Sequence, residues 1–194
     1  MTWPSRPVLA ALLLAGTALM LSPLSAYEIK QDVSYYPVSG VDMGEVISQM
    51  NTLGPQAADG KLRWALTDSR ITWSYQLQHS DEQCTAVAPQ VELQLSTTLP
   101  RWQNAADASL AAQDNWIRLK RVLQQHEDGH AAIARDCAAE IEAKLAQPVP
   151  AEKCSAAAEQ LTEAGDKIIA RCELAHEAYD QETLNGYLQG MNIQ

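Results

Sequence analysis

The sequence predicts an α+β fold, in which a small, mostly antiparallel sheet with a short helix is followed by a long helical hairpin. Segments that alternate apolar and polar residues all lie before residue 100. By contrast, the stretch from Ala105 to Ala146 has no proline, is rich in alanine and repeats its apolar residues at helical spacing. Hydrophobic residues make up 46% and charged residues 20% of the 194-residue chain, which is the balance of a globular protein.

The first 26 residues have the composition of a secretory signal peptide. Arg6 precedes an apolar stretch from Val8 to Leu21, and small residues before Ala26 offer a cleavage site. An uncleaved membrane anchor is the alternative, but this stretch is shorter than the ~20 residues that a bilayer-spanning helix needs. We therefore expect cleavage after Ala26, no stable membrane span afterwards, and a periplasmic or secreted bacterial protein.

The remaining chain, residues 27–194, is predicted to form one domain with a β-rich part (27–100) and a helical part (101–194). In the β-rich part, a short helix is expected over Asp42–Leu53, because Gly54-Pro55 would end it. Leu62–Leu66 is expected to pair with Ile71–Leu77 as a hairpin. The predicted strands are Tyr27–Val38, Ile71–Leu77 and Val91–Leu95.

The helical part is predicted to contain two helices separated by Gln147–Pro150, because the residue before each proline is pushed out of the α region. The first helix lies between Ala105 and Ala146. The second runs from about Pro150 to Tyr179, with proline at its first position. A polar tail from Tyr179 to Gln194 follows.

The charge of the chain argues against nucleic acid as a partner. Lys and Arg number 14 against 24 Asp and Glu, which gives a formal net charge of −10, and there is no basic stripe. Nucleic acid is therefore set aside as a partner.

The four cysteines are predicted to form two disulfides, because an exported protein folds in an oxidising compartment. Their spacings contain no CxxC pair, so a thiolate zinc site has no support, and all three possible connectivities stay open. The cysteines are Cys84, Cys137, Cys154 and Cys172.

A His-Glu-x-x-His motif lies in the predicted first helix, at His126, Glu127 and His130. Residues four apart share a helix face, so both imidazoles can reach a single Zn²⁺ ion. Both histidines also continue the apolar stripe of the helix, where imidazoles without partners would be costly to bury. Zinc ligation is therefore favoured over a pair of core histidines with other partners. The stripe consists of Leu119, Leu123, His126, His130, Ile133, Cys137, Ile141 and Leu145.

A catalytic zinc site needs a third protein ligand, and the second helix offers candidates for it. Antiparallel packing of the two helices would place His126 opposite roughly residue 170 and His130 opposite roughly residue 166, with His176 about 9 Å further along. A longer turn would bring His176 within reach. Asp180 and Glu173 are the carboxylate alternatives. The stripe of this helix consists of Leu161, Gly165, Ile168, Cys172, His176 and Tyr179.

The mature chain resembles the bacterial domain of unknown function 922 family, described as predicted secreted zinc-dependent proteases. The resemblance implies a zinc site on His126 and His130, with Glu127 as the catalytic acid/base, and a peptidase activity. In the family pattern a histidine precedes the last glycine, where this chain has Asn185. The motifs that carry the resemblance are Tyr35-Tyr36-Pro37-Val38-Ser39-Gly40, Thr72-Trp73-Ser74-Tyr75, Leu99-Pro100-Arg101-Trp102, Trp116, the His-Glu-x-x-His motif, and Tyr179-Asp180-Gln181-Glu182-Thr183 with Gly186.

The sequence thus leads to a zinc metallopeptidase as the first hypothesis. Glu127 would act as general base on a zinc-activated water, and Tyr179 or Tyr187 could stabilise the oxyanion. The second hypothesis is a catalytically degenerate envelope protein that keeps the fold, with or without zinc, to bind a partner. A structural zinc site that fastens the two helices is a third, weaker hypothesis. An intact Glu127 favours the first hypothesis, whereas Asn185 favours the second.

Overall fold

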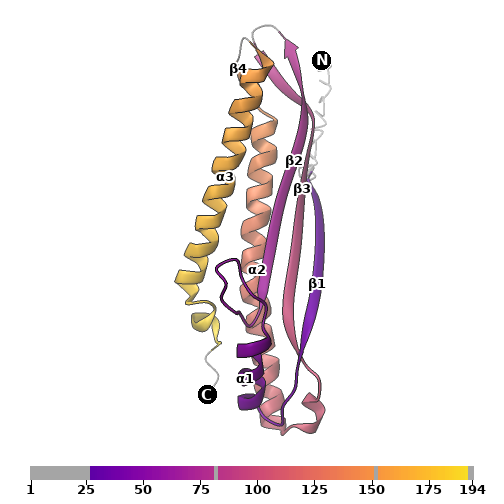
Figure 1. The fold of residues 1–194 in the computed structure, drawn as a ribbon, viewed down its shortest axis with the longest axis vertical. Helices are drawn as coiled ribbons and strands as arrows, with labels where there is room; N and C mark the ends of the chain where they lie inside the picture. The colour runs from indigo at the N-terminus through magenta and orange to yellow at the C-terminus, as the bar shows by residue number, and fades with distance from the viewer. Residues whose placement is uncertain (1–26, 81–82, 151–152, 192–194) are drawn as a thin grey trace, which may run out of the picture.

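The computed structural model describes residues 27–80, 83–150 and 153–191, which form a long, narrow molecule. Two long helices, α2 (Leu110–Leu145) and α3 (Cys154–Thr183), lie side by side along a twisted sheet (Figure 1). The predicted α+β class is therefore confirmed. The predicted signal peptide, residues 1–26, lies outside the described residues. None of the described helices is long and apolar enough to cross a membrane.

The sheet has the strand order β1-β3-β2. β2 (Leu66–Ser80) pairs antiparallel with the central strand β3 (Gln83–Trp102), and the short β4 (Val149–Pro150) pairs antiparallel with the start of β3. Both pairings agree with the mostly antiparallel sheet that the sequence predicts. β1 (Glu28–Val38) departs from the antiparallel pattern, because it runs parallel to β3. The predicted strands Ile71–Leu77 and Val91–Leu95 lie inside β2 and β3, and the predicted Tyr27–Val38 begins one residue before β1.

The predicted hairpin between Leu62–Leu66 and Ile71–Leu77 is wrong. Leu62 forms an isolated bridge with Gln56 in the loop after the first helix, and Leu66 already belongs to β2, which continues without a turn to Ser80. β3 is also longer than expected, because Pro89 does not interrupt it. The register with β2 shifts between Ser74 and Gln76, and this bulge accommodates the proline, which cannot donate a ladder hydrogen bond.

The short helix α1 (Met43–Leu53) follows the predicted boundaries closely. Asp42 caps it, since its Oδ1 accepts a hydrogen bond of 3.0 Å from the backbone N–H of Glu45. Ser109 caps α2 in the same way, by accepting from the backbone N–H of Ala112 at 3.2 Å. α3 begins later than predicted, at Cys154, because Pro150 lies in β4 instead of at the first helical position.

The core consists of two hydrophobic clusters that follow one another along α2. One cluster joins α1 and the ends of β1 and β3 to the first half of α2, up to Leu123. α1 marks the end of the molecule at which this cluster lies (Figure 1). The other cluster begins at Ala131 and joins the sheet to α2 and α3. His126, Glu127 and His130 therefore lie where one apolar cluster ends and the next begins.

Two disulfides are present, as predicted, and no cysteine among the described residues is free. Cys84 and Cys154 connect the start of β3 to the start of α3, whereas Cys137 and Cys172 connect α2 to α3 directly. Together they fix α3 to the rest of the molecule at one end and at its middle. Disulfides of this kind are typical of proteins from oxidising compartments.

Candidate metal centre

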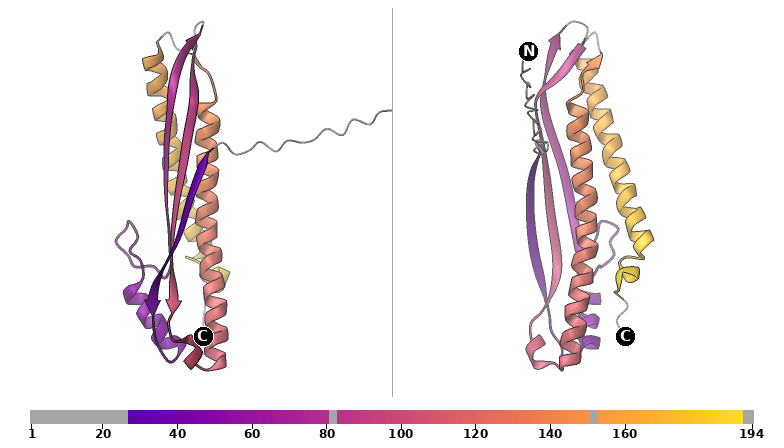
Figure 2. Two further views of the ribbon diagram at one scale, coloured as in Figure 1. Left: turned by 90° about the vertical axis from the view of Figure 1, so that its right-hand side faces the viewer. Right: turned by 180° about the vertical axis from the view of Figure 1, so that it is seen from behind.

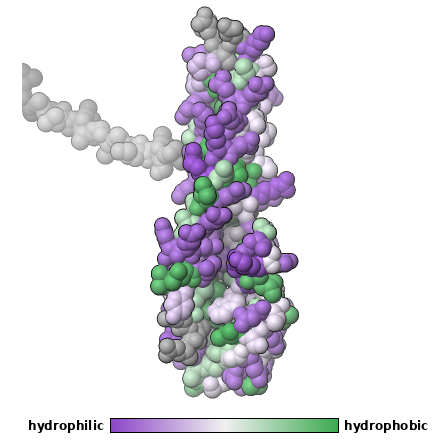
Figure 3. Space-filling model, turned by 60° about the vertical axis from the view of Figure 1, so that its left-hand side comes forward, coloured by the Kyte–Doolittle hydropathy of each residue, from purple (hydrophilic) through white to green (hydrophobic). Residues whose placement is uncertain are grey.

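The site lies in a cleft of about 630 Å³, next to the C-terminal end of α3. α2 contributes His126, Glu127 and His130 to its wall, and α3 contributes His176 and Asp180. The other walls come from the loop after α1, the start of β2 and the segment that follows α3. The surface near this end carries more hydrophobic side chains than the upper part of the same face, which is largely hydrophilic (Figure 3).

His126, His130 and Asp180 converge on one point. A single carboxylate oxygen, Asp180 Oδ1, lies 3.1 Å from His126 Nε2 and 3.0 Å from His130 Nε2. Each of the three residues offers a ligand atom within 4.8 Å of the other two. Tetrahedral zinc bonds of about 2.0–2.1 Å would place neighbouring ligand atoms about 3.3 Å apart, which is close to the spacing found here. Two imidazoles and a carboxylate are also a ligand set that suits zinc.

The contact of His126 Nδ1, the ring nitrogen that faces away from Asp180, determines which nitrogen of the ring carries the lone pair. Gln189 Nε2 donates to Tyr179 Oη at 2.9 Å, so the amide oxygen Oε1 of Gln189 faces His126 Nδ1 at 3.1 Å. Because a carbonyl oxygen only accepts, Nδ1 carries the hydrogen. In the neutral ring, Nε2 then directs a lone pair at Asp180, an arrangement that a cation between the two would stabilise.

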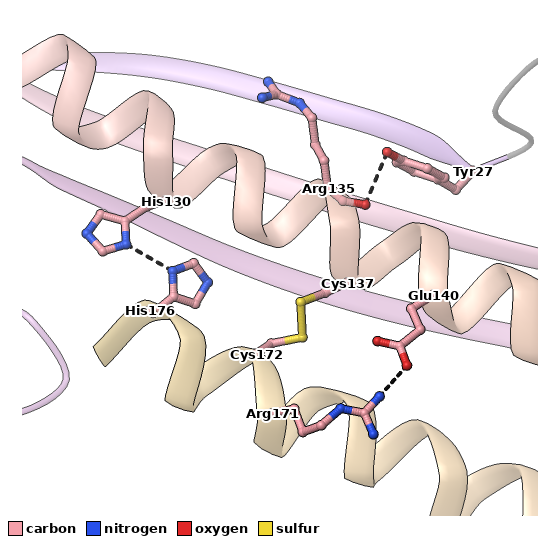
Figure 4. Close-up of a disulfide and its surroundings, with 8 residues drawn as sticks. All are labelled: Tyr27, His130, Arg135, Cys137, Glu140, Arg171, Cys172 and His176. Carbon is pink, nitrogen blue, oxygen red and sulfur yellow. Dashed lines mark hydrogen bonds and ion pairs between the residues drawn. A yellow bond between two sulfur atoms is a disulfide. The ribbon is translucent and has the colours of Figure 1, made fainter. Parts of the chain in front are cut away.

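His130 is held from behind by His176. Their Nδ1 atoms lie 2.9 Å apart (Figure 4). The other ring nitrogen of His130, Nε2, faces Asp180. His176 is therefore close to the site, but its contact is with a candidate ligand and it is not among the three convergent residues. Burial, followed by the charge of His130, lowers the pKa of His176.

The predicted alignment of the two helices is wrong by more than two turns. His130 faces His176 instead of a residue near 166, because β4 and the late start of α3 lengthen the connection between the helices. The same alignment is seen in the disulfide between Cys137 and Cys172. This shift brings Asp180, which sequence reasoning left as one alternative, to the two histidines. Glu173 also lines the cleft, but it lies outside the convergent group.

Asp180 interacts strongly with both imidazoles. Burial alone would raise the pKa of its carboxyl group, but the hydrogen bonds with His126 and His130 outweigh burial and hold that pKa well below its usual range. Burial likewise lowers the pKa of His126, and the hydrogen bond with Asp180 and the charge of Glu127 raise it overall. The site is thus arranged around a negative oxygen that requires positive charge beside it.

Glu127 is almost fully buried, with 3% of its surface exposed. Its Oε2 atom has no hydrogen-bond partner among the described residues, although it belongs to a side chain of the cleft wall. Burial raises the pKa of this carboxyl group. An unpartnered carboxylate oxygen beside candidate metal ligands is suited to accept a proton from a molecule in the cleft.

Tyr179 packs against both histidine rings. It stacks on His126, with ring centroids 5.1 Å apart and an interplanar angle of 16°, and meets His130 edge-on. Its hydroxyl group accepts from Gln189 and is not part of the cleft wall, whereas Tyr187 does line the cleft. Of the two tyrosines that the sequence suggested for oxyanion stabilisation, only Tyr187 faces the cleft.

Gly129, inside the His-Glu-x-x-His motif, makes room for Tyr179. A Cβ atom at this position would overlap with the phenol ring. We expect Gly129→Ala to displace Tyr179, to weaken metal binding by about tenfold or more through the loosened histidines, and to cost about 1–3 kcal/mol of stability. Isothermal titration with zinc and thermal unfolding test this. Unchanged affinity in a folded variant would contradict it. Gly44→Ala, in α1, is the control.

The disulfide between Cys137 and Cys172 lies about one turn of α3 away from His176 (Figure 4). Replacing both cysteines with alanine is expected to cost about 2–4 kcal/mol of unfolding free energy. It should also weaken metal binding, because α3 carries Asp180. The matched control is Cys84→Ala with Cys154→Ala, which removes the remote disulfide and should lower stability with less effect on metal affinity. Equal affinity losses in the two double variants would contradict this role.

The segment after α3 could not be predicted from the sequence. Leu184, Asn185 and Gly186 all adopt the left-handed region, with φ values of 49°, 51° and 83°. The backbone N–H of Asn185 donates to the carbonyl oxygen of Asp180 at 2.7 Å, and this turn brings Gln189 back to His126. Asn185 itself lines the cleft. The signal that the sequence offers for this segment is the pair Asn185-Gly186. Such a pair indicates a turn, but it does not show which residues the chain contacts after the turn.

A second group of potential ligands lies at the other end of the molecule, at His79, Cys84 and Cys154. The two cysteines form a disulfide, and His79 Nδ1 lies 3.5 Å from Cys84 Sγ. Because metal binding by cysteine requires a thiolate, this group is not a metal site while the disulfide is intact.

Comparison with known proteins gives one informative result. No curated protein and no solved structure is significantly similar to this chain. The family described as bacterial protein of unknown function, DUF922, matches residues 33–186. That range includes most of the sheet, both long helices, and the residues from His126 to Asp180. The chain therefore belongs to the bacterial family DUF922.

Proposed function

We propose that this protein is a zinc-dependent peptidase, with His126, His130 and Asp180 as zinc ligands and Glu127 as general base. The observation that carries the proposal is the convergence of these three residues beside a buried carboxylate whose Oε2 has no partner in the described part of the chain. Zinc bound there would polarise a peptide carbonyl group and make a water molecule more acidic. Glu127 Oε2 would accept the proton of the attacking water and pass it to the leaving amine.

The remaining residues of the site would hold this arrangement. His176 orients the His130 ring, and Gln189 orients the His126 ring, through the Nδ1 atoms that do not face the ligand point. Tyr179 would hold both rings in place through its contacts with His126 and His130. Tyr187, at the cleft wall, is the candidate to donate a hydrogen bond to the oxyanion.

A polypeptide is the substrate class that fits the cleft. Leu66, Thr67, Asp68 and Ser69, which are consecutive in β2, all line it. β2 is an edge strand of the described sheet, so an extended peptide could bind beside it through main-chain hydrogen bonds. Leu62 and Tyr187 also line the cleft and are 46% and 54% exposed, which offers apolar contacts to substrate side chains.

The same proposal places the protein in the periplasm or outside the cell. The two disulfides favour an oxidising compartment, and the first 26 residues have the composition of a signal peptide. A purified mature protein that begins at Tyr27 by mass spectrometry would support export. A protein that keeps residues 1–26 in the membrane fraction would contradict it.

A catalytically degenerate envelope protein is the second candidate, and Asn185 favours it. This residue lines the cleft where the family pattern has a histidine, and an amide oxygen is a weaker zinc ligand than imidazole. Such a protein would use the same fold to bind a partner without cleaving it.

Metal analysis combined with a proteolysis assay tests the proposal. We expect close to one zinc per chain, and cleavage of an unfolded protein such as casein that a chelator abolishes and added zinc restores. A metal-free protein that does not bind added zinc would overturn the metal site. A zinc-loaded protein without activity over a wide panel of unfolded substrates would favour the second candidate.

A further inference from the structure

A second groove, of about 770 Å³, lies between the sheet and the first half of α2. Its walls come from the ends of β1 and β3 and from one face of α2, and it shares no lining residue with the cleft of the metal centre. Figure 2 shows β1 at the outer edge of the sheet. The first half of α2 lies in the lower part of the molecule in both views, beside the lower part of the sheet. This groove is therefore a separate surface.

Three cations line the groove: Arg101 from β3, and Lys120 and Arg121 from α2. None of them has an acidic partner within 4.0 Å in the described part of the chain. Asp128, the acidic residue of the groove, accepts a hydrogen bond of 2.9 Å from Gln124 and forms no ion pair with these cations among the described residues. In a chain with a net charge of −10, this is a local concentration of unpaired positive charge.

The groove also offers apolar and aromatic surface between these charges. Arg101 lies over the ring of Tyr35, 4.3 Å from its centroid, so its guanidinium group is held at the groove wall. Tyr35 and Ile117 are 47% and 50% exposed. Below them, Trp102 and Trp116 form a buried edge-to-face pair, with centroids 5.9 Å apart. An occupant with both carboxylates and apolar side chains would complement this surface.

We propose that this groove binds an extended acidic segment of a partner polypeptide, in which Asp or Glu residues alternate with aliphatic or aromatic ones. The volume exceeds what a single small anion needs. Trp102 and Trp116 are buried between sheet and helix, so an extended peptide reaches this part of the groove more easily than a flat bilayer does. The inference does not depend on the metal centre, and it would hold whether or not the protein is a peptidase.

Binding of two labelled peptides to the purified protein, followed by fluorescence anisotropy, tests this proposal. One peptide alternates Glu with Leu and Tyr, and the other has Lys in place of each Glu. We expect only the acidic peptide to bind, more weakly as salt is raised. Reversing two charges, in Lys120→Glu with Arg121→Glu, should weaken its binding by about tenfold or more.

The matched control is Arg70→Glu with Lys153→Glu, which changes the net charge equally at exposed positions that line neither cavity. It should leave peptide binding nearly unchanged, and circular dichroism should show that both double variants are folded. Equal losses in the two variants, or equal binding of the two peptides, would overturn the proposal. The proposal would also be overturned if the protein bound phosphatidylglycerol vesicles through Lys120 and Arg121 but did not bind the acidic peptide. The groove would then contact a membrane instead of a polypeptide.

Discussion

Glu127→Gln is expected to reduce peptide hydrolysis by about 10²–10⁴-fold while leaving zinc content and fold intact. Glutamine has nearly the same shape as glutamate but cannot accept the proton of the attacking water. Because Glu127 is buried and its Oε2 has no partner within residues 27–80, 83–150 and 153–191, the neutral side chain should not lower the melting temperature. Hydrolysis of casein, zinc content and thermal unfolding of the variant would be measured together.

The matched control for this prediction is Glu173→Gln. Glu173 is a second glutamate of the cleft wall, but it lies outside the convergent group of candidate ligands. This variant should keep most of the activity, because its carboxylate has no role in the proposed proton transfer. A Glu127→Gln variant that hydrolyses casein as fast as the wild type would exclude Glu127 as the general base.

His126→Ala and Asp180→Ala are each expected to abolish stoichiometric zinc binding. Zinc at 1,000 times its dissociation constant stabilises a folded protein by about 4 kcal/mol, and both variants should lose that contribution. The wild type should therefore melt at a lower temperature after chelation, whereas the melting temperature of the variants should not respond to zinc or chelator. Calorimetry with and without zinc measures this directly.

His176→Gln separates an orienting residue from a ligand. If His176 only positions His130, this variant should bind zinc about 10–100-fold more weakly but still reach one ion per chain. His79→Ala, at the remote end of the molecule, should bind zinc like the wild type. Full loss of zinc in His176→Gln together with normal binding in Asp180→Ala would show that the third ligand is His176.

Local periodicity was sufficient to predict several features of this protein. The spacing of His126 and His130 places them on one helix face whatever surrounds the helix, because four residues span about one turn. The capped short helix after Asp42 and the alternation of Ile71–Leu77 depend in the same way on neighbouring residues. The α+β class follows from such local patterns, and the family membership from the motifs distributed along the chain.

Only the tertiary structure decided which distant residues meet. The alignment of α2 and α3 depends on where the second helix begins, and a few residues of error at the turn moved the predicted contact of His130 from residue 166 to His176. The disulfide pairing and the parallel register of β1 with β3 are likewise choices among alternatives that local spacing does not distinguish. Gln189 reaches His126 only because three left-handed residues reverse the chain after α3. Helix periodicity is a property of neighbouring residues, whereas the ligand set and its supporting hydrogen bonds depend on long-range packing that is set by the lengths of the connections.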